Sequence, residues 1–452
     1  MKDKTIISSI YDMAKSVMNC ILLLGPLRRL RTKAWRLRDD LRLARRVFRC
    51  KWNYAHVIKR IRSKPKGEKI RVLFLVGEPA KWKCQKLYEA MRTSGIFEPI
   101  VGLSAWNMQT EAVCPDDQLD AFHCEAERFF DKLGVTHVRT YSLHPRRQID
   151  LSTFAPDLVF YSEPWGPAKS QTPEPVSRFA LTFFIPYFTP SHGDVKWEAR
   201  HELHRFLYEY ITLNEKWAEI FRAGLRPWNF AAKFVGLGHP SLDFFAVAVA
   251  TKGRESGIIY APHYSFPALN PNMPRSYIYP FSTFDWNGEA ILSYAQTHPE
   301  FGWIFKPHPL LRRYLVESGF WTKEKTDAYY AAWERLGRVC YDGDYQNLFL
   351  ESRILVTDCC SFLTEYGATG KPIIHLLRED TGVTPLQPSK TVFDTFYQVH
   401  DLEEMSTVFK MVLEEGLDPK GEERLAAVRE AQIAGSNSSE NIIEHLRELV
   451  KR

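Results

Sequence analysis

The stretch from Arg353 to Leu376 constrains the fold of this chain more than any other. It holds two short apolar runs rich in β-branched residues, each suited to a strand buried on both faces. Between them come a break at Thr357, a run with helical spacing, and Gly370, which is placed to end a helix before Pro372. The order strand, loop, helix, strand predicts a parallel α/β sheet.

The loop and first helical turn of this unit carry Asp358, Cys360 and Ser361. In such a unit the free N–H groups of the helix N-terminus point beyond the carboxyl end of the strand and favour an anion such as phosphate. Asp358 and Ser361 are also ordinary helix-capping residues. The pattern alone leaves both roles, capping and ligand binding, open.

A chain of 452 residues, 45% of them hydrophobic, buries a large core and is expected to form at least two domains. A series of strands and helices begins at Ile70, and a second series begins at Gly257, so we expect doubly wound α/β units. The expected divisions are a basic segment at 1–66, a first domain at 67–250, a second at 251–420, and a helical C-terminal part at 421–452 that packs back on the first domain.

Eight cysteines occur without a CxxC pair, and no secretory signal is recognised. We therefore expect no zinc site and no disulfide framework. We also expect no other metal and no cofactor. The thiols are expected to be buried or unused, in a reducing cytoplasm.

The net charge of +6 is unevenly distributed. Residues 27–69 carry +14 and residues 1–26 carry +1, which leaves −9 for the remainder. Aromatic and aliphatic residues lie among these arginines with helix-compatible spacing, a pattern typical of a helix on an anionic membrane surface. A solvated basic helix packed on the protein body is the alternative. Nucleic acid is disfavoured because the remainder is acidic. The apolar run at 17–24 is too short to span a bilayer.

Four histidines directly follow predicted strands: His192, His239, His263 and His308. In parallel α/β folds the carboxyl ends of the strands line the binding site. Imidazole there can accept a proton from an attacking hydroxyl or donate a hydrogen bond to a phosphate oxygen. For each histidine a structural role is the alternative, but four equivalent positions indicate a shared functional role.

These histidines belong to motifs whose order resembles the CDP-glycerol glycerophosphotransferases, the teichoic-acid and capsule polymerase family. The resemblance covers about 155–380 and rests on the following motifs: Ser191-His192-Gly193, Gly238-His239-Pro240-Ser241-Leu242-Asp243, Tyr260-Ala261-Pro262, Lys306-Pro307-His308-Pro309, and Thr357-Asp358 with Ser361 and Gly370-Lys371-Pro372. It implies a GT-B architecture, two Rossmann-like domains facing a cleft. A CDP-activated polyol phosphate would bind the second domain and be transferred to a hydroxyl of a lipid-linked or polymer acceptor, at the cytoplasmic face of the cell membrane.

Carried over by position, His192 matches the family's general base and His308 the histidine at the donor phosphates. Ser361 matches a serine at the pyrophosphate, and Cys360 stands where the family has another serine, so one hydroxyl donor is missing. Asp194-Val195-Lys196 and His263-Tyr264-Ser265-Phe266 also depart from the family pattern. These departures leave the transferred group open.

Further candidates surround these residues. Lys306, Asp358 and His263 are expected at the donor phosphates, with a surface position as the alternative for Lys306. Glu365, one helical turn after Ser361, and His239 are candidates for binding a hydroxyl, although a solvated helix position is the alternative for Glu365. The rival functions are a GT-B glycosyltransferase that uses a nucleotide sugar and a non-catalytic scaffold at the membrane surface.

Overall fold

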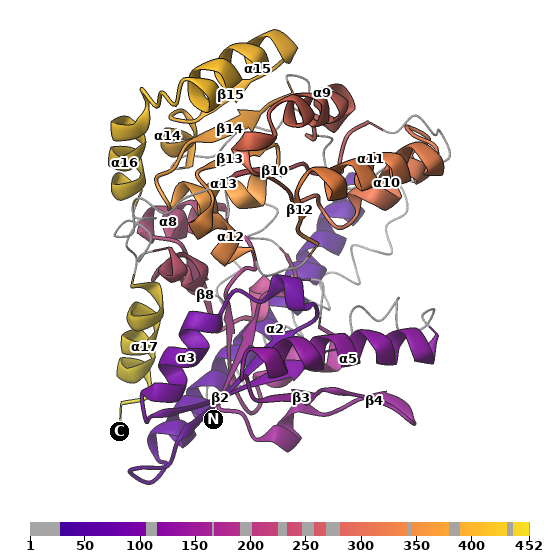
Figure 1. Cartoon of the computed structure of the whole chain (residues 1–452). Coiled ribbons are helices and arrows are strands. Elements are labelled where there is room, and N and C mark those ends of the chain that lie inside the picture. The colour runs from indigo at the N-terminus through magenta and orange to yellow at the C-terminus, as the bar shows by residue number, and fades with distance from the viewer. Residues whose placement is uncertain are drawn as a thin grey trace.

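The computed structural model describes residues 28–104, 115–164, 167–189, 201–224, 233–245, 257–267, 281–341, 345–378, 389–431 and 437–451. Two parallel sheets form the centres of two α/β domains, which lie one above the other in Figure 1. This arrangement confirms the predicted fold class.

The first sheet has seven parallel strands in the order β3-β2-β1-β6-β7-β8-β9. The strands are β1 (Ile70–Val76), β2 (Phe97–Leu103), β3 (His137–Arg139), β6 (Leu158–Tyr161), β7 (Leu181–Phe184), β8 (Glu209–Thr212) and β9 (Lys233–Gly236). A separate antiparallel hairpin pairs β4 (Tyr141–Leu143) with β5 (Arg146–Gln148). The strand order reverses between β1 and β6, which marks the switch point of a doubly wound sheet.

Both faces of the first sheet are buried, because neighbouring residues of β1 pack into different cores. Phe74 belongs to a core that includes side chains of the long helix α2 (Arg28–Arg62), α3 (Gln85–Thr93), α5 (Asp116–Lys132) and α17 (Ser438–Leu449). Leu73 and Leu75 point into a second core with α6 (Pro173–Val176) and α8 (Glu215–Gly224). The alternation follows from the two-residue period of a strand.

The second sheet has six parallel strands in the order β12-β11-β10-β13-β14-β15. The strands are β10 (Ile258–Ala261), β11 (Trp303–Phe305), β12 (Arg338–Val339), β13 (Ile354–Thr357), β14 (Ile373–Leu376) and β15 (Tyr397–Val399). Its strand order reverses between β10 and β13, so the unit predicted around Thr357 lies at the switch point.

Helices cover the second sheet as well: α9 (Phe284–Thr297), α10 (Leu311–Glu317), α11 (Lys323–Leu336), α12 (Gln346–Glu351), α13 (Cys360–Gly367), α14 (Ser389–Phe393), α15 (Leu402–Phe409) and α16 (Gly421–Glu430). Short single-turn helices are η1 (Pro79–Lys81), η2 (Leu151–Phe154), η3 (Lys169–Gln171), η4 (His204–Phe206), η5 (Pro240–Phe244) and η7 (Pro299–Phe301), and η9 (Lys410–Glu414) is a π-helical turn. Gly370 has φ +73° and a Cβ there would lie 2.4 Å from Leu425, so only glycine suits the turn after α13.

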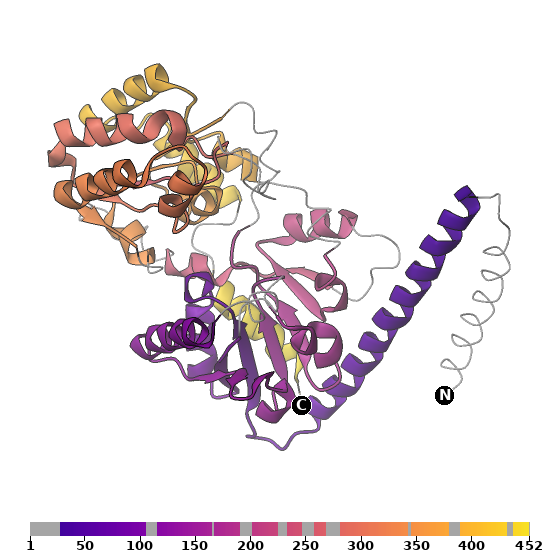
Figure 2. The ribbon, with the colours of Figure 1, turned by 90° about the vertical axis from the view of Figure 1, so that its right-hand side faces the viewer.

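The long basic helix α2 has two different parts. Its second half packs on the first domain: Val47, Tyr54 and Ile61 are buried, and Arg46 pairs with Glu174 at 2.6 Å. Its first half stands away from the body of the molecule in Figure 2. The expected segment 1–66 therefore does not behave as one unit, since its described residues from Val47 onward contribute to the core of the first domain. Among the described residues, no helix is both long and apolar enough to cross a bilayer.

The two domains are in direct contact. The rings of Phe245 in the first and Phe349 in the second stack with centroids 6.1 Å apart. The Asn214 side chain donates a hydrogen bond to the Ala431 carbonyl at 3.0 Å. The chain then returns to the first domain, where α17 packs against α3.

Candidate functional site

Two of the predicted histidines lie side by side at the carboxyl ends of adjacent strands. His263 follows β10 and His308 follows β11, and their ring centroids are 4.5 Å apart. Nδ1 of His263 accepts a hydrogen bond from the Ser265 amide at 3.2 Å, and Nδ1 of His308 accepts one from the Leu310 amide at 3.1 Å. Each neutral ring therefore carries its proton on Nε2 and offers an N–H donor.

Burial keeps both rings neutral near pH 7. Burial, with the nearby Lys306 ammonium as a second cause, lowers the pKa of His308 to about 4. Burial also lowers the pKa of His263 well below its ordinary value, with His308 as a second cause. The pair thus presents N–H dipoles, to which the oxygens of a phosphate can bind.

This depressed pKa makes stability depend on pH. In the unfolded chain the histidine has a pKa of about 6.5, so as the pH falls the unfolded state takes up the proton before the folded state does. The contribution of the neutral His308 to the free energy of unfolding is therefore fully present above pH 6.5 and is lost as the pH falls towards 4. From pH 7 to pH 5, wild type is expected to lose about 2 kcal/mol more unfolding free energy than His308→Gln. Denaturant titration at both pH values measures this difference, and equal losses would contradict it.

Asp358 supports this site from within rather than offering an oxygen to a ligand. One carboxylate oxygen accepts the His263 amide at 2.6 Å, and the other accepts the Ser282 hydroxyl and the Thr283 amide and hydroxyl at 2.8, 2.7 and 3.1 Å. Burial raises the pKa of Asp358, although these donors oppose the shift. Asp358 therefore fixes the loop of His263 and the start of α9, which corrects its expected place at the phosphates.

Helix α13 begins at the switch point, and its capping residue is Cys359, whose side chain makes no capping hydrogen bond. Neither Asp358 nor Ser361 therefore serves as the expected cap. Ser361 lies in the first turn with its Oγ 3.2 Å from the Cys359 sulfur. Cys360 begins the helix, and burial raises the pKa of its thiol, which remains protonated. The first turn can offer backbone N–H groups and one hydroxyl to an anion.

Lys306 is a buried ammonium, 6% exposed, and not the surface residue of the alternative interpretation. Its Nζ lies 5.4 Å from the ring centroid of Tyr345 and 5.7 Å from that of Phe362 on α13. Lys306 thus adds positive charge close to the N-terminal turn of α13.

His239 has a structural role. Its Nε2 lies 2.7 Å from the Pro186 carbonyl oxygen and its Nδ1 lies 2.7 Å from the Ser241 hydroxyl. Both nitrogens of the buried ring are therefore used to join the loop after β7 to η5, and no nitrogen is left for the expected hydroxyl ligand. Burial lowers the pKa of His239 accordingly.

Glu365 is 1% exposed, so it does not occupy a solvated helix position. It accepts a hydrogen bond from the Tyr345 hydroxyl and pairs with Lys83 of the first domain at 3.6 Å. Sequence reasoning missed Lys83 and Tyr345. The signal available for Lys83 was its position in the loop just after β1, at the switch point of the first sheet. Lys371, which belongs to the motif Gly370-Lys371-Pro372, donates from its Nζ to three carbonyls at the end of α12, including that of Ser352 at 2.5 Å.

The predicted base, His192, lies outside the described residues. Among the described residues of the first domain, an ion pair joins Lys81 after β1 to Glu163 after β6, at 2.8 Å. Within the described ranges, no group of three or more His, Cys, Asp or Glu side chains is arranged to hold a metal ion.

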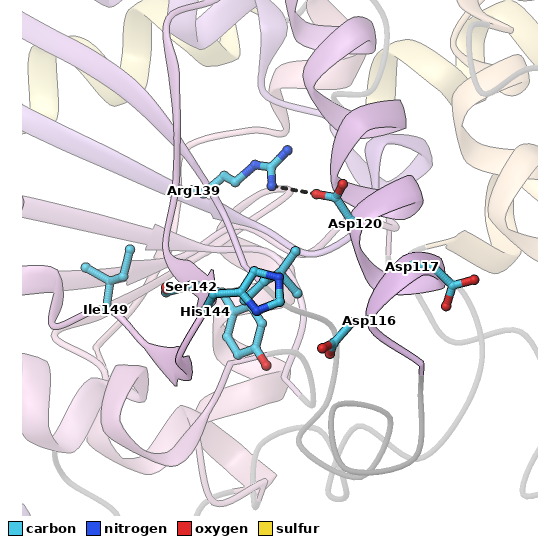
Figure 3. Close-up of a pocket in the computed structure, with 9 residues that line it drawn as sticks. Asp116, Asp117, Asp120, Arg139, Ser142, His144 and Ile149 are labelled. Atoms are coloured by element: carbon cyan, nitrogen blue, oxygen red, sulfur yellow. Dashed lines mark hydrogen bonds and ion pairs between the residues drawn. The ribbon is translucent and has the colours of Figure 1, made fainter.

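A cavity of about 620 Å³ lies elsewhere, between α5 and the β4–β5 hairpin. Figure 3 shows Asp120 paired with Arg139 and Asp116 pointing towards His144, whereas Asp117 points away. This cavity lies beside the edge strand β3 and shares no residue with the histidine pair, so it is separate from the candidate site.

Two doubly wound α/β domains in contact are the architecture of a GT-B fold. Solved structures with this fold are similar to the chain. The wall teichoic acid polymerase TagF has a TM-score of 0.52 at 12% identity, covering 91% of this chain and 98% of that chain. The structure of S. aureus MnaA with UDP has a TM-score of 0.51 at 11% identity, and the match covers 84% of this chain and 96% of that chain.

The UDP-GlcNAc 2-epimerase of Neisseria meningitidis, bound to UDP-GlcNAc, has a TM-score of 0.50 at 14% identity, covering 84% of this chain and 100% of that chain. No family model and no curated protein matches the sequence. The resemblance seen in the motifs is therefore confirmed at the level of the fold.

Proposed function

We propose that this protein transfers a polyol phosphate, most simply glycerol phosphate, from a CDP-activated donor to a hydroxyl of a lipid-linked or polymer acceptor and releases CMP. The observation that carries the proposal is the pair of Nε2–H donors of His263 and His308, beside Lys306 and the first turn of α13. Neutral donors, an ammonium and a helix N-terminus together suit a pyrophosphate.

The reaction requires an acceptor oxygen to attack the β-phosphorus, while the bond from that phosphorus to the bridging oxygen breaks. CMP leaves with the electron pair, and the acceptor's proton passes to a base, for which we propose His192. Lys306, His263, His308 and Ser361 would stabilise the charge on the phosphates. Positioning and electrostatic stabilisation supply most of the catalysis in such transfers.

The TagF structure supports this choice of donor class, and the neighbours with bound UDP or UDP-GlcNAc support the rival, a glycosyltransferase that uses a nucleotide sugar. The order of motifs favours the CDP-polyol donor. Analysis of the products formed from CDP-polyols and from nucleotide sugars tests the proposal directly.

Ser361→Ala tests the donor site separately from catalysis. Losing one hydrogen bond from a hydroxyl to a charged phosphate costs about 1.5–3 kcal/mol of binding free energy, so the affinity for CDP is expected to fall about ten- to a hundredfold. Cys360→Ser, which restores the hydroxyl of the family's first serine at this motif, is expected to retain or strengthen binding. Calorimetric titration of CDP measures both. An unchanged affinity in Ser361→Ala with a lowered melting temperature would show a structural role alone.

We also propose that the exposed face of α2 binds an anionic membrane surface, which would place the protein at the inner face of the cell membrane. Trp35, Leu37, Phe48 and Trp52 are 42%, 51%, 39% and 46% exposed. Leu37, Phe48 and Trp52 lie on one side of the helix, opposite the buried Tyr54, by helical spacing. Apolar side chains on a helix within a +14 segment suit a bilayer interface.

Changing these four exposed side chains to serine is expected to weaken binding to anionic vesicles about a hundredfold and to leave the core intact. Added salt should weaken wild-type binding. Co-sedimentation measures both effects. Leu402→Ser with Leu417→Ser, at exposed positions in the second domain, is the matched control. Deleting residues 1–64 is unsuitable because it removes the buried part of α2. Unchanged binding in the fourfold variant would remove the membrane proposal.

A further inference from the structure

A lysine of the first domain reaches into the candidate site of the second. Lys83 lies between η1 and α3, after the carboxyl end of β1, and its side chain is 10% exposed. Its Nζ donates to the Tyr345 hydroxyl, lies 4.2 Å from the Tyr345 ring centroid, and lies 3.6 Å from Oε1 of Glu365. These contacts join the loop after β1 to α12 and α13.

The three side chains form a directed chain of hydrogen bonds. The Lys83 ammonium donates to the tyrosine oxygen, and the Tyr345 hydroxyl donates to Oε2 of Glu365. A carboxylate with 1% exposure is costly to bury without a paired cation and donors. Lys83 and Tyr345 supply the Glu365 carboxylate with a cation and a hydrogen-bond donor, and they fix its orientation.

Glu365 stands one helical turn after Ser361, so the two side chains lie on the same face of α13. A carboxylate accepts hydrogen bonds from hydroxyl groups, and the ribose that carries the phosphates of a nucleotide has two of them, at C2′ and C3′. Tyr345 also lies close to Lys306, with Nζ 5.4 Å from its ring centroid. The interdomain contact and the donor site thus share one side chain.

We propose that Lys83 is a positioning residue that orients Glu365 for the ribose diol of the bound nucleotide, so that recognition of the diol depends on contact between the two domains. This inference rests on the proposed function, because it takes a nucleotide as the ligand on α13. It adds a residue of the first domain to the donor site of the second.

Lys83→Met tests this inference, since methionine keeps an aliphatic chain over the Tyr345 ring but removes the charge and the donor. We measure the dissociation constants of CMP and of 2′,3′-dideoxy-CMP by calorimetry. Wild type is expected to bind CMP more tightly than 2′,3′-dideoxy-CMP. In Lys83→Met the ratio of the two dissociation constants is expected to fall about ten- to a hundredfold. The control is Lys86→Met, a lysine of α3 that pairs with Glu89 of its own helix at 3.5 Å and should leave the preference unchanged.

Tyr345→Phe keeps the ring and removes only the hydroxyl, so it should lower the same preference and gives a second test if Lys83→Met does not fold. An unchanged preference in either folded variant, even with a lower melting temperature, would overturn the positioning role and leave a purely structural contact. Failure of wild type to bind CMP, CDP or UDP would instead overturn the proposed function, and the inference with it.

Discussion

Replacing His192 with alanine is expected to lower turnover by about 10²–10⁴-fold, because a general base typically contributes that factor to proton transfer. The expectation rests on the position of His192 after a strand of the first domain and on the family motif that it matches. The measurement is the rate of CMP release at saturating donor and acceptor. Affinity for CDP should stay near wild type, because His192 is not among the groups proposed to bind the donor.

His400→Ala is a suitable control, since His400 lies after β15 and its exposed ring bonds to Glu404 at 2.9 Å. It should retain the wild-type rate. A His192→Ala variant that is folded and turns over at nearly the wild-type rate would show that another group accepts the proton.

The second large effect is expected at Asp358. Removing its carboxylate leaves the amides of His263 and Thr283 buried without their partner. Each such group costs about 1–3 kcal/mol, so Asp358→Ala should lose about 2–6 kcal/mol of unfolding free energy. It should also weaken CDP binding, because the loop that carries His263 loses its support. Denaturant titration and calorimetry measure the two effects.

Asp401→Ala is the matched control. Asp401 also accepts two backbone amides, those of Glu403 and Glu404, but at the exposed start of α15. Water can replace its carboxylate, so the expected loss is about 1 kcal/mol. Equal losses in the two variants would show that burial does not set the cost at Asp358.

Much of the fold could be predicted because buried parallel strands are apolar throughout. The strand β1 begins at Ile70, where the first series was expected to begin, and β14 ends at Leu376, the expected end of the unit around Thr357. The strand β8 (Glu209–Thr212) was missed, because it begins with a glutamate. Glu209 is buried and bonds to His445 at 2.6 Å, a partner 236 residues away that no local pattern reveals.

Prediction of the site is limited in the same way, because a local pattern does not reveal contacts between distant parts of the chain. Strand ends identified His263 and His308, which the structure brings into contact. They also identified His239 and Asp358, but a pattern does not show that the polar atoms of a side chain already have partners inside the protein. Lys83 and Tyr345 are 262 residues apart, so their contact depends on how the two domains pack.

The proposed reaction is transfer of a polyol phosphate from a CDP-activated donor. The direct measurement is to incubate the full-length protein with CDP-glycerol, CDP-ribitol, UDP-sugars and CMP-sugars, each with a lipid-linked hydroxyl acceptor, and to identify the nucleotide and the product by chromatography and mass spectrometry. We expect CMP release from a CDP-polyol together with a new phosphodiester. Release of UDP from a UDP-sugar, or of CMP from a CMP-sugar with a new glycosidic bond, and no turnover of either CDP-polyol, would contradict it.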